Sequence, residues 1–120
     1  MAAKAILIVL CLAVGLGIYL GMLYLRGERR PKLIGYHLIL GATTIEGTLV
    51  LIHGAPNGEI MLATDIGTIA AGLFAASLLT GFIGPLLARR SRSQAEVVLV
   101  THVGVGLAGF AAFLMWMTRQ

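Results

Sequence analysis

Charged residues are scarce in this chain of 120 residues. They make up 12% of it, about half the share found in ordinary soluble domains, whereas 58% of the residues are hydrophobic. The mean hydropathy is +0.95. This composition excludes an ordinary soluble domain and indicates an integral, multi-pass membrane protein.

Cysteine and long polar segments are scarce as well. The single cysteine, Cys11, excludes a disulfide within the chain and is no metal site by itself. The polar connections between the apolar runs are short and read "RGERRPK", "GAPNGE" and "RRSRSQAE". They leave no room for a soluble catalytic domain, so any chemistry has to lie within the apolar segments or on a partner.

Four apolar runs are long enough to cross a bilayer core of roughly 30 Å as helices. They predict an all-α, four-helix transmembrane bundle, a single integral membrane domain over residues 1–120. The expected helices lie near 4–25, 33–53, 60–88 and 97–118. The first run exceeds the roughly 7 to 15 apolar residues of a signal-peptide core, so we expect a retained helix there.

The basic residues are distributed unevenly among the connections. The first holds Arg26, Arg29, Arg30 and Lys32, and the third holds Arg89, Arg90 and Arg92. Because Lys and Arg favour the cytoplasmic side, both termini are predicted on the outer side of a cytoplasmic (inner) membrane. Trp116, near the outer end of the fourth run, fits an interfacial anchor. The net charge of +4 is thus a topology signal and not a sign of nucleic-acid binding.

Two stretches of the chain resemble each other: "GYHLILGATT" at 35–44 and "VTHVGVGLAG" at 100–109. Each has a histidine, His37 or His102, and a glycine four residues later, Gly41 or Gly106. With the predicted helix ends, both histidines lie roughly 8 to 9 Å above the cytoplasmic boundary on helices of the same direction. Positions i and i+4 share a helix face, so each glycine is expected to leave a notch for a flat cofactor.

Two opposed imidazoles at one depth are the ligand set of a bis-histidine haem. We therefore predict one haem b per chain, with His37 and His102 as metal ligands. Its iron would carry electrons between a quinone or redox partner and another carrier. This describes an electron-transfer subunit rather than a stand-alone enzyme, working with other membrane subunits or as a homo-oligomer. The remaining histidine, His53, lies about 160° around the helix from His37 and does not extend the same cofactor face.

The helix content and the His-x-x-x-Gly pattern resemble the cytochrome b561-type membrane proteins, which are small haem-b electron carriers. The haem-b anchor subunits of succinate dehydrogenases are a more distant resemblance. The resemblance implies that His37 and His102 are axial haem ligands and that Gly41 and Gly106 allow close approach of the macrocycle. It covers the second and fourth predicted helices.

Two carboxylates and a histidine form a second candidate site, in the outer leaflet. Glu46 precedes His53 by seven residues, nearly two helical turns, so the two share a face. Asp65 enters the membrane from the next helix at a comparable depth. Glu46, His53 and Asp65 are a possible proton or quinone site. The alternative is that the carboxylates hydrogen-bond to threonines or a neighbouring subunit and only hold helices in register.

Two other functions fit the same sequence. A cofactor-free structural subunit of a larger membrane complex would use the histidines as interhelical hydrogen-bond donors. A (bacterio)chlorophyll-binding photosynthetic subunit would ligate each pigment through one histidine, without requiring His37 and His102 to face each other. The equal depth of the two histidines favours haem over the pigment-binding subunit.

Overall fold

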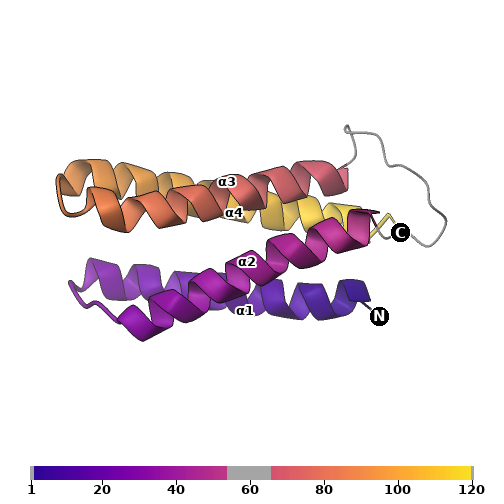
Figure 1. Ribbon diagram of the computed structural model, residues 1–120, viewed down its shortest axis with the longest axis horizontal. Helices are drawn as coiled ribbons and strands as arrows, with labels where there is room; N and C mark the ends of the chain where they lie inside the picture. Colours follow the sequence, from indigo (N-terminus) through magenta and orange to yellow (C-terminus); the bar gives the residue numbers. More distant parts are fainter. Residues whose placement is uncertain (1, 54–65, 120) are drawn as a thin grey trace.

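A computed structural model describes residues 2–53 and 66–119 of the chain (Figure 1). Its elements are α1 (Ala2–Leu25), α2 (Pro31–His53), α3 (Ile66–Leu87) and α4 (Arg92–Met117). Each of these helices is long and apolar enough to cross a membrane. The predicted all-α, four-helix transmembrane architecture is thereby confirmed for the described residues.

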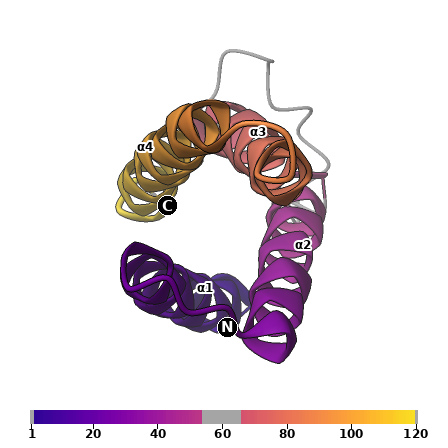
Figure 2. The ribbon, with the colours of Figure 1, turned by 90° about the vertical axis from the view of Figure 1, so that its left-hand side faces the viewer.

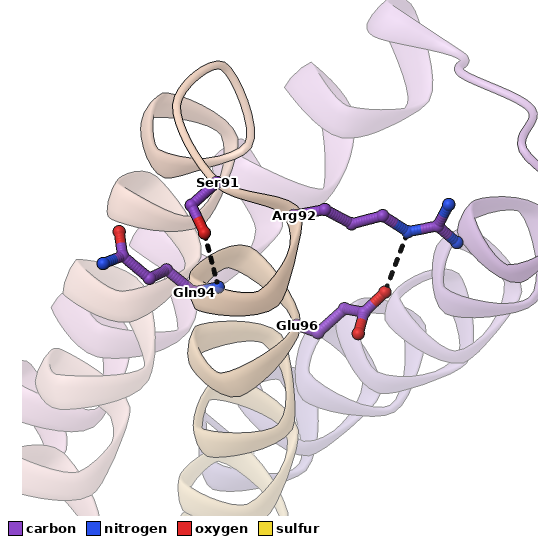
Figure 3. A network of polar contacts seen from close by, with 4 residues as sticks. All are labelled: Ser91, Arg92, Gln94 and Glu96. Carbon is purple, nitrogen blue, oxygen red and sulfur yellow. Dashed lines mark hydrogen bonds and ion pairs between the residues drawn. The ribbon is translucent and has the colours of Figure 1, made fainter.

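The helix boundaries differ most from the prediction at the start of α4. This helix begins at Arg92 rather than near residue 97 because Ser91 caps it, accepting a hydrogen bond from the Gln94 backbone N–H at 3.4 Å (Figure 3). The sequence Ser-x-x-Gln is a capping-box pattern. One turn on, Arg92 Nε lies 3.0 Å from a Glu96 carboxylate oxygen, a favourable i,i+4 pair. Residues 60–65 of the third predicted helix lie outside the described residues.

A glycine turn ends α1. The Gly27 N–H donates to the Tyr24 carbonyl and the Glu28 N–H donates to the Leu23 carbonyl, each at 2.9 Å. These two bonds form a Schellman motif, which requires a left-handed residue after the helix. Gly27 supplies it with a φ of 74°. The chain thus leaves α1 in a fixed direction and enters α2 at Pro31, a residue favoured at the first helical position.

The four helices form two antiparallel hairpins, α1–α2 and α3–α4 (Figure 1). Viewed along the bundle, they follow one another around an arc in chain order (Figure 2). The α3–α4 packing is the most extensive, α2 joins the hairpins by packing on α3, and α1 meets α4 least. The backbones of α2 and α4 face each other diagonally without packing directly. Both chain ends lie at one end of the bundle (Figure 1); their membrane side stays a prediction.

The buried positions recur from one hairpin to the other. Two buried positions of α1 reappear in α3 after 64 residues, and two buried positions of α2 reappear in α4 after 65. The corresponding pairs are Leu10 with Phe74, Ala13 with Ser77, Thr44 with Gly109 and Thr48 with Phe113. The two hairpins therefore share this spacing at four buried positions.

An aromatic cluster fills the end of the bundle where the termini lie. The Phe113 ring lies 6.2 Å from Phe74 and 5.7 Å from Trp116, between centroids. Trp116 is only 5% exposed and packs on Gly67, where an added Cβ would come within 2.9 Å of the indole Nε1. The predicted role of Trp116 as an interfacial anchor is wrong, because a glycine on α3 lets the ring enter the core.

Replacing the glycine that ends α1 tests the turn. Gly27→Ala is expected to lower the free energy of unfolding by about 1 to 2 kcal/mol, because the left-handed conformation places Cβ against the carbonyl oxygen. Unfolding in detergent micelles measures the change. Gly15→Ala is the control, since an added Cβ there meets nothing within 4 Å. Equal losses in the two variants would contradict this account of the turn.

Candidate functional site

His37 and His102 meet in the interior of the bundle. Their ring centroids are 5.8 Å apart and their planes are inclined by 81°. The two side chains come from α2 and α4, the diagonal helices, and each is partly buried. The structure therefore brings together the two histidines that the sequence paired.

The two rings meet although their residues lie at unequal distances from the helix starts. His37 is six residues from Pro31, a rise of about 9 Å, and His102 is ten residues from Arg92, a rise of about 15 Å. The prediction measured the depth of His102 from Glu96, four residues inside the observed helix.

Each imidazole lies against a glycine of the neighbouring helix in its own hairpin. A Cβ added to Gly17 of α1 would lie 2.8 Å from Cε1 of His37, and a Cβ added to Gly81 of α3 would lie 2.7 Å from Cε1 of His102. Real Cβ atoms do not approach so closely. Glycine at these two positions is therefore what gives the rings their space.

The glycines predicted to flank the histidines face α3 instead. A Cβ on Gly41 would meet only Leu78 Cδ1, at 3.8 Å, and one on Gly106 would meet only the Ser77 side chain, with Oγ at 3.0 Å. Neither position has an imidazole within 4 Å. A residue four along does share the helix face, but each ring turns sideways toward its hairpin partner. The notches that hold the rings are thus at Gly17 and Gly81.

These two glycines had a sequence signal. Ala13 and Gly17 on α1, and Ser77 and Gly81 on α3, are both small residues four apart, the pattern of close helix contact in membranes. The pattern indicates close contact but does not identify the side chain that fills the space.

Hydrogen bonds to Ser77 orient His102. Its Nδ1 lies 2.7 Å from the Ser77 carbonyl oxygen, and a carbonyl can only accept, so Nδ1 carries the proton. The Ser77 hydroxyl lies 3.2 Å from both Nδ1 and the His102 carbonyl oxygen, to which it donates. In a neutral imidazole this leaves Nε2 unprotonated, with its lone pair available for a metal.

His37 has no equivalent hydrogen bond. Its Nδ1 is buried without a partner. The residue that corresponds to Ser77 in the repeat is Ala13, which has no hydroxyl; its carbonyl faces the imidazole without forming a hydrogen bond to Nδ1. A buried ring nitrogen without a hydrogen bond is costly, so the two imidazoles differ in how well their polar atoms are satisfied.

The described residues include two members of the second candidate site, Glu46 and His53. Glu46 is exposed on the outside of α2, where it lines a cavity of about 280 Å³ with Ile6 and Thr43 among others. His53 is also exposed, and its Nδ1 lies 2.9 Å from the Leu49 carbonyl oxygen. Asp65 lies outside the described residues. The exposed Glu46 side chain is therefore accessible from this cavity between α1 and α2.

Within residues 2–53 and 66–119, no three or more His, Cys, Asp or Glu side chains are grouped so that they could hold a metal ion. The His37–His102 pair offers two donors. Two imidazoles are insufficient for a closed zinc site, which needs four ligands, but they are the protein's full contribution to a bis-histidine haem.

No protein-family model matches the chain, and no curated protein or solved structure is similar to it. Function is therefore inferred from the arrangement of the histidines and of the residues that hold them.

The contact between Gly81 and His102 can be tested by one methyl group. Gly81→Ala is expected to push the imidazole from the Ser77 carbonyl and to cost roughly 1 to 3 kcal/mol of unfolding free energy, as overpacking does. Gly72→Ala on the same helix is the matched control, because an added Cβ there meets nothing within 4 Å. Unfolding in detergent and the imidazole NMR signals report the two effects. An unchanged His102 signal in Gly81→Ala would disprove the contact.

Proposed function

We propose that the chain is a b-type cytochrome subunit that holds one haem between His37 and His102. The single observation that carries the proposal is the meeting of two imidazoles, from diagonal helices, inside a membrane bundle. Ionisable groups at such positions are functional candidates by default, because they are costly to keep in the membrane.

The residues present fit the ligand set of a haem. Imidazole nitrogens bind first-row metals at about 2 Å, so two rings sharing one ion have centroids roughly 6 Å apart. The observed separation is 5.8 Å. The unprotonated Nε2 of His102 supplies one lone pair, and His37 would supply the second from whichever ring nitrogen carries no proton. When bound, haem supplies one-electron transfer, and iron with both axial positions filled does not take up oxygen.

The surrounding residues have distinct parts in this proposal. The Ser77 carbonyl fixes the tautomer and orientation of His102, as outer partners of metal-bound histidines do. Gly17 and Gly81 set how far each ring stands from its neighbouring helix. Gly41 and Gly106 remain candidate close-approach positions, since neither places a side chain between its helix and α3.

Electrons would pass between a quinone or redox partner and another carrier. The cavity beside Glu46 is lined by one carboxylate, which favours this place for proton uptake or release. In this proposal Glu46 is the proton-accepting group, and His53 and Asp65 are further candidates. Other membrane subunits or a second copy of the chain would supply the next carrier.

One observation favours the cofactor-free structural subunit. The hydrogen bonds between His102 and Ser77 join α3 to α4, and such bonds between membrane helices contribute about 0.6 kcal/mol on average. In that case the two imidazoles contact each other only as part of the packing between the helices and hold no cofactor. The experiment below separates the two functions.

A reduced-minus-oxidised visible spectrum of the purified chain tests the haem proposal. We expect a low-spin b-type spectrum that is lost in both His37→Ala and His102→Ala, because iron needs both axial ligands. His53→Ala is the control and should keep the spectrum. Circular dichroism checks that each variant remains helical.

Two outcomes would contradict the proposal. A wild-type chain that lacks haem when purified with its membrane partners would leave the structural subunit. A chromophore that survives the loss of either one of the two histidines would indicate a pigment ligated by a single imidazole.

A further inference from the structure

A basic cavity lies at the end of the bundle opposite the termini, where both hairpins turn. Its volume is about 460 Å³, and its lining comes from two separate connections. The end of α1 and the connection after it contribute Tyr24, Leu25, Arg26, Gly27, Glu28 and Arg29. The connection between α3 and α4 and the start of α4 contribute Ala88 and Arg92. Figure 1 shows both turns at that end of the bundle. The cavity therefore bridges the end of α1 and the start of α4.

The charge in this cavity is positive. Three arginines line it, against one acidic residue, Glu28. The Glu28 carboxylate is already paired with Arg30 at 3.3 Å. Within the described part of the chain, Arg26 and Arg29 take part in neither of the two ion pairs. Two guanidinium groups are thus available for an anion that the protein does not itself supply.

The third arginine retains part of its binding capacity. Arg92 engages Glu96 through Nε, and a guanidinium carries further N–H donors beyond that atom. Figure 3 shows its side chain extending away from α4. Arg92 can therefore bind an anion from the second hairpin while Arg26 and Arg29 bind it from the first.

The cavity also has an apolar side at the membrane boundary. Leu25 is 83% exposed at the end of a helix that is long and apolar enough to span the bilayer. Tyr24, beside it, has an apolar ring with a hydroxyl donor, the combination enriched at membrane interfaces. A ligand here would meet positive charge on one side and apolar surface on the other.

We propose that this cavity binds the phosphate headgroup of an anionic phospholipid. Guanidinium groups bind phosphate with two parallel hydrogen bonds, and basic pockets between membrane helices bind anionic headgroups. The acyl chains would lie along Leu25. The lipid joins α1 to α4, the two neighbouring helices that touch each other least, and so closes the bundle at this end. This site is independent of the haem proposal.

Binding of defined lipids to the full chain tests the proposal. Native mass spectrometry in detergent compares added phosphatidylglycerol, phosphatidylcholine and glycerol 3-phosphate. We expect the chain to retain phosphatidylglycerol and Arg26→Gln/Arg29→Gln to bind it roughly 20- to 30-fold more weakly, since each charge contributes about five-fold near an anionic surface. Arg92→Gln, a milder change in the other hairpin, is expected to lose about five-fold.

Arg89→Gln/Arg90→Gln is the matched control. It removes the same charge from the same end of the bundle, but neither residue lines the cavity, so it should bind phosphatidylglycerol within about two-fold of wild type. An equal loss in both double variants would overturn the site in favour of general charge attraction. Equal retention of phosphatidylcholine would also overturn it. Tight binding of glycerol 3-phosphate would assign the cavity to a soluble phosphate and overturn the lipid proposal.

Discussion

The contact of each imidazole with a glycine on the neighbouring helix is the constraint on which the centre of the bundle depends. A histidine ring can stand beside a helix backbone only where no side chain intervenes, and Gly17 and Gly81 meet that requirement. Because each contact lies within one hairpin, each hairpin positions its own ring. The diagonal pairing of His37 and His102 then needs only that α2 and α3 pack together, which they do.

The two halves of this site are alike in geometry and different in chemistry. Ser77 gives His102 a carbonyl partner and a hydroxyl contact, whereas Ala13 leaves the buried nitrogen of His37 unpaired. The ring on α4 is therefore held, and the ring on α2 is restrained chiefly by packing. A ligand bound between them would be approached by one fixed imidazole and one that can still adjust its orientation.

The sequence was sufficient to predict the four helices and the pair of histidines, because both depend on properties that need no knowledge of packing. Span length and hydropathy are local, and the repeated His-x-x-x-Gly pattern is visible in the letters. The side of each helix that faces the core was harder to predict from the sequence, since a helix that is apolar on every side carries little information about which side is buried. For that reason the sequence predicts Gly41 and Gly106 beside the imidazoles and Trp116 at the membrane interface. The early start of α4 was predictable from Ser91 and Gln94, but three arginines made that stretch resemble a loop.

The repeated hairpin gives the central site the composition of a symmetric interface. Each hairpin contributes one histidine, one glycine notch and one basic turn, so two copies of a chain half as long would bring together nearly the same set of groups by dimerising. Linking the halves covalently replaces that association by an intramolecular step, whose effective concentration does not depend on how much protein the membrane contains. It also allows the two halves to differ, as the serine beside one histidine and the alanine beside the other do.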